Sequence, residues 1–105
     1  MAADDLRGRL DGMLLAVLER RPMHGYAVIE ALSERSGGRL SVPTGTVYPA
    51  LRRLERDGLL DGEWSEVDGR RRRTYRLTAQ GRRALADQRA AWTRFSDLIT
   101  QVMGA

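Results

Sequence analysis

Arginines are the side chains of this sequence best suited to chemistry with a partner. All 18 basic residues of the 105-residue chain are arginine, and four of them form the unbroken run Arg70–Arg73. A guanidinium donates planar, forked hydrogen bonds that fit phosphate oxygens and guanine edges better than a lysine ammonium does. A genome rich in G and C would explain the total equally well, so the positions of the arginines carry the information.

Charge and composition restrict the classes of function. The formal net charge of +4 and the isoelectric point of about 10.6 favour a polyanionic partner such as nucleic acid. With no cysteine, a single histidine and no Walker-type glycine loop, the chain gives no support to catalysis or to a metal site. We therefore expect no enzyme activity and no cofactor. We expect the one histidine, His24, to pack or to form a hydrogen bond at the start of a helix.

The cellular setting follows from the same composition. The absence of cysteine fits a reducing compartment, and no apolar run approaches the ~20 residues that a membrane span needs. We expect a cytoplasmic protein with no membrane partner.

Apolar residues at helical spacing predict two scaffold helices in the first third of the chain. Leu10, Met13, Leu14, Val17 and Leu18 form the stripe of the first helix, which Pro22 ends. A second helix is predicted from about His24 to Ser36, ended by Gly37 and Gly38.

A third helix, roughly Thr44 to Asp57, combines an apolar face with a basic one. Val47, Leu51 and Leu54 share one side. A step of about 100° per residue puts the arginines of this segment, Arg52, Arg53 and Arg56, on the opposite side. Either Thr44 or Thr46 is expected to cap the start of this helix. One face should pack while the other meets a partner.

Two strands should follow as a hairpin. Leu59–Val67 and Arg70–Leu77 flank the dipeptide Asp68-Gly69, a strong signal for a type I′ turn. Tyr75 and Leu77 should alternate inward, with Trp64 helping to cover the same side. The predicted fold is mainly α (α+β), a winged helix-turn-helix with a two-stranded β wing and a long C-terminal helix.

The last helix should run from a cap at Thr78 to about Met103. Apolar residues repeat along it at alternating spacings of three and four, interrupted by the polar Gln88. This seam is too apolar for water, so we expect it to pair with the same helix of a second copy. The expected dimer interface is Leu85, Trp92, Phe95, Ile99 and Val102. We thus divide the chain into a DNA-binding segment, 1–77, and a dimerisation helix, 78–105, within one compact unit.

Three segments supply the side chains that we expect to contact DNA. These are Tyr26, Thr44, Thr46, Tyr48, Arg52, Arg53, Arg70, Arg71, Arg72 and Arg73. N-terminal residues of a recognition helix reach base edges, and arginines of a wing reach phosphates. Plainer alternatives stay open: Tyr26 packs over the first helix, the threonines and Tyr48 only cap and fill the helix start, and Arg52 and Arg53 pair with Glu55 or Asp57.

The order of these motifs resembles the PadR family of bacterial transcriptional regulators, in its short subgroup with a single C-terminal helix. The resemblance lies in MHGYAVIEAL, TGTVYPALRRLERDGLL and RRRRTYRLTAQGRRAL, and covers about Leu10 to Val102. It implies a dimeric winged-helix repressor whose third helix enters the major groove. The wing would contact the DNA backbone or minor groove, and the last helix would make the dimer.

The resemblance also implies a small-molecule effector. Some short members bind flat aromatic or cationic compounds between the subunits, with a tryptophan of the last helix stacking on the ligand. Trp92 matches that position, and Trp92, Phe95 and Gln88 are the expected effector-binding residues. The wing here is unusually dense in arginine for this family.

The sequence as a whole therefore predicts a homodimeric, sequence-specific DNA-binding repressor that an effector at the dimer interface releases. The alternative is a winged-helix module that docks a different protein through its apolar last helix. Such a module has no need of arginines on the third helix and the wing, so the first interpretation is favoured.

Overall fold

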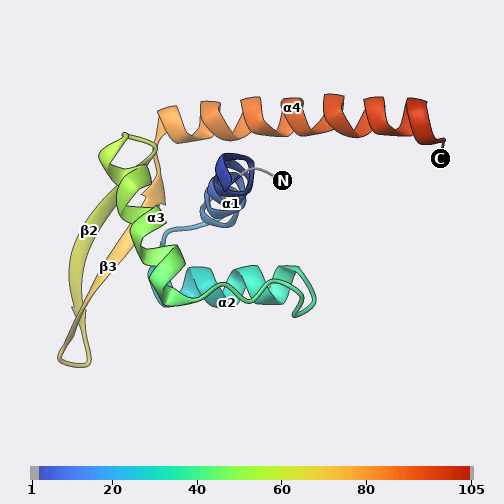
Figure 1. Ribbon diagram of the computed structural model, residues 1–105. Coiled ribbons are helices and arrows are strands. Elements are labelled where there is room, and N and C mark those ends of the chain that lie inside the picture. Colours follow the sequence, from blue (N-terminus) through green and yellow to red (C-terminus); the bar gives the residue numbers. More distant parts are fainter. Residues whose placement is uncertain (1–2, 105) are drawn as a thin grey trace.

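Helices and strands follow one another in the order of a winged helix-turn-helix (Figure 1). The computed structural model describes residues 3–104. Residues 1 and 2 of the predicted DNA-binding segment and residue 105 of the predicted dimerisation helix lie outside this range. The elements are α1 (Ala3–Leu18), β1 (Met23–His24), α2 (Gly25–Arg35), α3 (Thr44–Arg56), β2 (Leu60–Val67), β3 (Arg70–Leu77) and α4 (Ala79–Met103). The predicted fold class is confirmed, and every predicted helix and strand is present with bounds shifted by a few residues at most, apart from the earlier start of α1.

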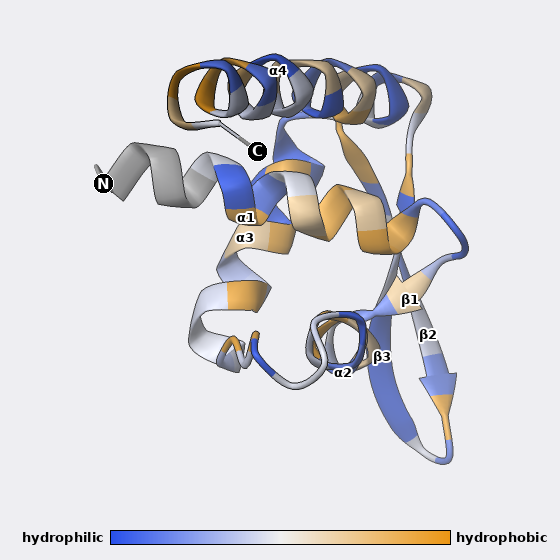
Figure 2. Cartoon of the chain, turned by 90° about the vertical axis from the view of Figure 1, so that its right-hand side faces the viewer, coloured by the Kyte–Doolittle hydropathy of each residue, from blue (hydrophilic) through white to orange (hydrophobic). Residues whose placement is uncertain are grey.

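The core forms where α1, α2 and α3 meet the base of the wing. Leu14 and Leu15 of α1 are fully buried, as are Val47 and Leu51 of α3. Tyr75 closes this core from the wing. The apolar stripes predicted from helical spacing are therefore the faces that pack, and Figure 2 shows hydrophobic residues along the helices of this bundle.

The start of α3 differs from both alternatives for its cap. Pro43 is the N-cap residue, no side chain caps the helix, and Thr44 is already helical. The backbone N–H groups of Thr46 and Val47 donate to the carbonyl of Pro43 at 3.0 and 3.1 Å. Pro49 consequently lies inside the helix rather than in its first turn, where its missing N–H deprives the Gly45 carbonyl of a donor. The Thr44 and Thr46 hydroxyls are thus not used as caps.

The two wing strands, β2 and β3, belong to a three-stranded antiparallel sheet in the order β1-β3-β2. The Asp68-Gly69 turn has φ angles of 52° and 75°, as a type I′ turn requires. Met23 and His24 pair with Tyr75 and Thr74 of β3, which adds a short strand that the sequence did not predict. This strand ties the beginning of α2 to the wing.

The first turns of α4 are fixed to the wing, and the rest of this helix is not. The Thr78 hydroxyl accepts from the Gly81 N–H at 3.0 Å and donates to the Gly58 carbonyl at 2.7 Å, which confirms Thr78 as the cap. From Arg89 to Gly104 every residue is exposed. The helix projects away from the other elements (Figure 1), and the chain measures 55 × 29 × 25 Å. None of the helices within residues 3–104 has the length and apolar character needed to cross a bilayer.

The junction at Gly81 yields a test of the packing. A Cβ at Gly81 would lie 2.1 Å from the Leu59 carbonyl oxygen and 2.8 Å from a Leu77 methyl, so Gly81→Ala should lower the free energy of unfolding by about 2–3 kcal/mol. Gly8→Ala is the matched control. It lies in α1 with nothing within 4 Å, and should raise stability by up to about 1 kcal/mol. Urea denaturation of both variants checks this, and equal midpoints for the two would contradict the described contact.

Candidate nucleic-acid interface

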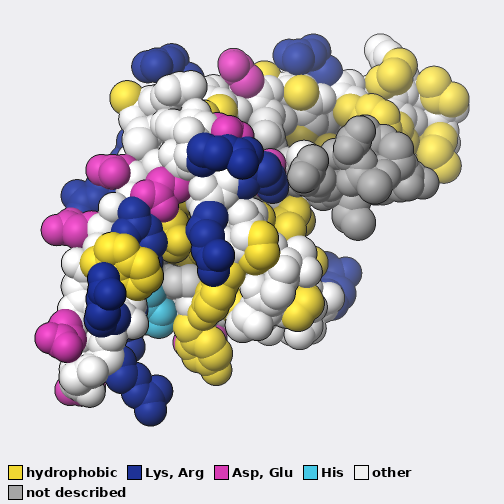
Figure 3. Space-filling view, turned by 60° about the vertical axis from the view of Figure 1, so that its left-hand side comes forward, with side chains coloured by type: hydrophobic (Ala, Val, Ile, Leu, Met, Phe, Trp, Pro, Cys, Tyr) yellow, Lys and Arg dark blue, Asp and Glu magenta, His cyan; other side chains and the backbone are white. Residues whose placement is uncertain are grey.

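Exposed arginines of α3 and the wing lie on one side of the molecule, where Figure 3 shows basic side chains interspersed with acidic and hydrophobic ones. Thr44, Thr46 and Arg52 of α3 are exposed. On the wing Arg70 and Arg71 are exposed and Arg72 is half-buried. Tyr26, at the start of α2, is 57% exposed. The structure therefore brings these predicted residues to the surface of adjacent elements.

The two faces of the wing carry different arginines. Strand alternation puts Arg71 and Arg73 on the face of Tyr75, together with Trp64, whose direct cross-strand partner is Arg73. The guanidinium carbons of Arg71 and Arg73 lie 4.6 and 5.2 Å from the centre of the Trp64 ring. These are distances at which a cation is attracted to the face of an aromatic ring.

Trp64 does not help to cover the core as expected. It lies on the predicted side of β2, yet its side chain is 55% exposed. The reason is that the strand continues outward from its buried end at Leu60, and its cross-strand neighbours Arg71 and Arg73 cover the ring instead.

Arg53 is not on the free face of α3. Its two terminal nitrogens donate to the two carboxylate oxygens of Asp11 in α1 at 2.7 and 2.8 Å, and the two side chains are only 21% and 15% exposed. The hydrogen bond to Asp11 raises the pKa of Arg53. This pairing corrects the expectation that Arg53 contacts DNA, and it is also not the pairing with Glu55 or Asp57 that stood as the alternative.

Arg73 is likewise held within the subunit. It makes a forked pair with Glu55 of α3, with Nε donating to Oε1 at 3.0 Å, and also donates to the Gly62 carbonyl at 3.1 Å. The hydrogen bond from Arg73 lowers the pKa of Glu55. A Cβ at Gly62 would lie 2.6 Å from Arg73 Nε, so a larger residue there would shift the pair from its present position. Arg73 thus joins the wing to α3, and three of the four arginines in the run Arg70–Arg73 are available to a partner.

Tyr48 and His24 occupy structural positions beside this face. The Tyr48 ring is half-buried over Gly25, where a Cβ would come within 2.4 Å of a ring carbon. The Nδ1 atom of His24 accepts from the Ala27 N–H at 3.4 Å and so caps α2, which confirms the hydrogen-bonding role expected of this histidine. Burial, followed by the charge of Arg72, lowers the pKa of His24.

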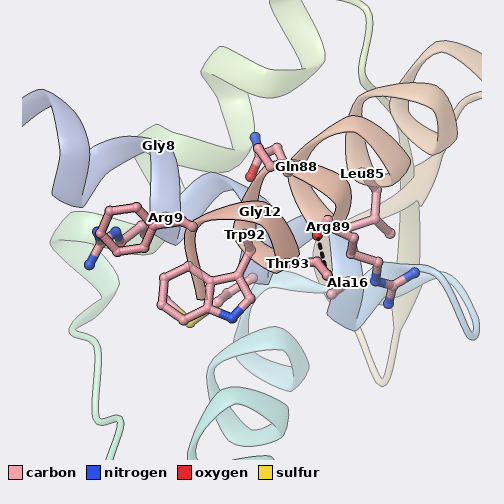
Figure 4. A pocket seen from close by; sticks show the side chains of 12 residues that line it. Gly8, Arg9, Gly12, Ala16, Leu85, Gln88, Arg89, Trp92 and Thr93 are labelled. Atoms are coloured by element: carbon pink, nitrogen blue, oxygen red, sulfur yellow. Dashed lines mark hydrogen bonds between the residues drawn. The ribbon is translucent and has the colours of Figure 1, made fainter. Parts of the chain in front are cut away.

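A second site lies between α1 and α4. A groove of about 850 Å³ is open to solvent there (Figure 4), and its lining is Gly8, Arg9, Gly12, Met13, Ala16, Leu85, Gln88, Arg89, Ala91, Trp92, Thr93 and Phe95. The Trp92 and Phe95 rings have centroids 5.9 Å apart, and the Arg9 guanidinium lies 5.5 Å from the Trp92 ring. The three predicted effector residues, Trp92, Phe95 and Gln88, are therefore together in one groove.

The charges of this groove are unevenly distributed. Among the described side chains of residues 8–104, Arg9 and Arg89 line it and no carboxylate does. Arg89 makes a forked pair with Glu19 at 3.0 Å for both contacts, which lowers the pKa of Glu19, whereas Arg9 lies over the Trp92 ring.

The apolar seam of α4 begins later than predicted. Leu85 is only 3% exposed and belongs to the core of its own chain, which corrects its assignment to a dimer interface. Trp92, Phe95, Ile99 and Val102 are all exposed. Leu98 and Met103, which the heptad spacing left out, extend the exposed apolar surface. Among the side chains that the structure describes, those of residues 8–104, no cluster of three or more His, Asp or Glu is placed to hold a metal ion.

Comparisons with known proteins agree with this architecture. The "Transcriptional regulator PadR-like family" model matches residues 14–87. The transcriptional regulator Rv3488 of Mycobacterium tuberculosis is 48% identical over 82 residues, which cover 78% of this chain and 71% of that protein.

Solved structures give the same result. A PadR-like transcription factor from Bacteroides fragilis superposes with a TM-score of 0.84 at 32% identity, covering 95% of each chain. Bacillus subtilis PadR, solved in complex with operator DNA, shares the fold with a TM-score of 0.69 at 24% identity, covering 75% of this chain and 45% of that one. The chain belongs to the PadR-like family of transcriptional regulators, and is a regulator of transcription rather than an enzyme.

Proposed function

We propose that the chain is a homodimeric, sequence-specific DNA-binding protein that represses transcription. The observation that carries this proposal is that exposed side chains of α3 lie beside a wing that presents Arg71 on one face and Arg70 and Arg72 on the other. A rigid helix beside a basic hairpin matches the width of a major groove and its flanking phosphates. A protein of the same fold has been solved on operator DNA, which is consistent with this use of the face.

The residues divide into two groups by what they can reach. Thr44, Thr46 and Arg52 stand free at the start and outer side of α3, where base edges are read. Arg70, Arg71 and Arg72 extend from the wing, where phosphates on either side of the groove are expected. Tyr26, at the start of α2, is exposed enough to contact a phosphate. Tyr48 is half-buried and would offer only its outer edge.

We propose that the exposed apolar stripe of α4 packs against the same stripe of a second copy of the chain. Residues 78–105 are then the dimerisation helix. Trp92, Phe95, Leu98, Ile99, Val102 and Met103 lie within its last 12 residues. Contiguous apolar surface of this kind marks an interaction site. Because the stripe repeats at heptad spacing, two copies can pair it with itself across a two-fold axis. Such a dimer would present two α3 helices to successive major grooves about 34 Å apart.

An effector site at the groove of Trp92 is the remaining part of the proposal. The aromatic pair favours a flat aromatic compound, and the groove adjoins the proposed dimer seam. Arg9 and Arg89 are the charged residues among the described lining of the groove; Arg89 is paired with Glu19, and Arg9 occupies the place of a cation over the Trp92 ring. The structure therefore favours an aromatic carboxylate over a cation. Such a compound would release DNA to the extent that it prefers the arrangement of the dimer that cannot bind DNA.

The wing is tested by the salt dependence of binding. Affinity for DNA should fall by ~10³-fold or more between 50 and 200 mM salt if six or more phosphates are neutralised. Replacing Arg71 and Arg72 by Gln should weaken binding to all duplexes alike and reduce the slope of log K against log salt by about two. The control is the Arg82→Gln, Arg83→Gln protein, whose neighbouring exposed arginines lie at the start of α4, far from the wing tip. A slope unchanged by the wing substitutions would remove the wing from the mechanism.

The dimer is tested at Ile99. Ile99→Glu puts a charge into the exposed stripe, so light scattering should show a single chain at concentrations where the parent is a dimer. Operator affinity should fall by more than tenfold, about 1.4 kcal/mol, because the two half-sites are then bound separately. Gln101→Glu adds the same charge on the opposite side of α4 and should change neither property. A parent protein that stays a single chain at high concentration, or that co-purifies with a different protein on this stripe, would refute the homodimer.

The effector site is tested with two compounds that share a ring. Calorimetry should show 2-naphthoate binding at least about tenfold more tightly than 2-naphthylmethylammonium. Trp92→Ala should abolish binding of both, Arg9→Gln should remove the preference for the anion, and Trp64→Ala should change nothing. Equal binding of both compounds by the parent would contradict the proposed ligand class.

A further inference from the structure

The middle of α1, from Arg9 to Gly12, lines the groove and also contacts α3. We propose that the Asp11–Arg53 ion pair positions α3 on the DNA and transmits changes in the α1–α4 groove to it. Asp11 and Arg53 are then positioning residues for DNA recognition, an assignment that rests on the proposed function. The inference follows from two contacts of the same turn of α1 and from the burial of the residues around that turn.

The first contact joins α1 to α3. Asp11 and Arg53 are 42 residues apart and meet through two parallel hydrogen bonds of 2.7 and 2.8 Å. A forked pair of this kind fixes both distance and angle, which a single contact to a point charge does not. Both side chains are mostly buried, so removing one partner leaves the other charge without compensation. Arg53 directly follows Arg52, which stands on the free face of α3.

The second contact joins the same turn of α1 to α4. At Gly12, the residue after Asp11, a Cβ would lie 2.1 Å from the Gln88 side-chain oxygen. Gln88 therefore lies directly against the α1 backbone, and both residues line the groove (Figure 4). One turn earlier, Arg9 reaches the ring of Trp92.

The third observation concerns what holds α1 itself. From Leu14 onward its inner residues are fully buried, whereas Asp11 and Gly12 are only partly buried and Met13 is exposed. The turn around Asp11 thus lies at the edge of the core, where Leu10 packs against it, and the contacts of Asp11 and Gly12 to α3 and α4 hold it in addition. A molecule that displaces Gln88 or Arg9 therefore acts on the backbone adjacent to Asp11. Through the pair of Asp11 with Arg53 it changes the position of α3.

The positioning role is tested by a mutant cycle on DNA binding. The probe is the duplex that the wild-type protein selects from a random-sequence library, compared with a shuffled duplex of the same length. Asp11→Asn and Arg53→Gln should each lower the ratio of the two affinities at least ~5-fold, and the double variant should be no worse than either alone. Arg53→Lys keeps the charge but loses the fork, and should lower the ratio as well. Glu63→Gln, which removes the exposed pair with Arg76, should leave it unchanged.

The transmission is tested at Gly12. Gly12→Ala must displace Gln88, so it should change affinity for the selected duplex at least ~5-fold in the wild-type background and not in the Asp11→Asn background. Circular dichroism melts identify the temperature at which all variants are folded for these measurements.

Two results would overturn the inference while leaving the proposed function intact. One is a loss confined to the Arg53 variants with Asp11→Asn unaffected, which would mean that Arg53 contacts DNA directly. The other is an equal effect of Gly12→Ala in both backgrounds. A wild-type protein that selects no sequence from the library would instead refute the proposed function itself.

Discussion

The structure depends on burying one side of α3 while the other side stays in solvent. Val47 and Leu51 are fully buried and Leu54 nearly so, and they supply the part of the core that α1, α2 and the wing share. A chain of this size buries only a modest fraction of its surface, so no other element could replace that contribution. The same burial decides which α3 residues can face a partner, because the helix has no freedom to rotate without exposing this stripe.

The orientation of α3 and of the wing is fixed further by two arginines whose side chains pair within the subunit and not on the proposed DNA face. Arg53 fixes α3 against α1 through Asp11, and Arg73 fixes the wing against α3 through Glu55. A buried ion pair stabilises little in net terms, since desolvation offsets most of the attraction. Its geometric demand is the important property, because a forked pair tolerates little change in angle. We interpret these two pairs as devices of orientation, set where recognition needs α3 and the wing at a defined angle.

Sequence patterns predicted the features that depend on residues close together in the chain. Helical spacing, the Asp68-Gly69 turn and the Thr78 cap each depend on neighbouring residues, and all are present. The partners of Arg53 and Arg73 depend on which distant elements meet, so these arginines are indistinguishable in sequence from those left free. The assignment of Leu85 to the dimer interface was wrong for a related reason: a heptad pattern does not show where the core of the chain ends and its exposed seam begins. The signals that were available are glycines, since Gly62 and Gly12 each lack the side chain that would block a long-range contact.

The few contacts that fix the angle of α4 lie close to the groove of Trp92. Among the described residues the helix is anchored by Gly81 and Leu85, and then by Gln88 against Gly12, by Arg89 with Glu19 and by Arg9 over the Trp92 ring; its residues from Arg89 to Gly104 are exposed. From Leu85 to Val102 a helix extends about 25 Å, so a tilt of roughly 10° at the anchor moves the far end by about 4 Å. In the proposed dimer that end meets its partner, and the tilt would change the separation of the two α3 helices. A compound bound beside Gln88 and Trp92 therefore acts where the smallest displacement has the largest effect on half-site spacing.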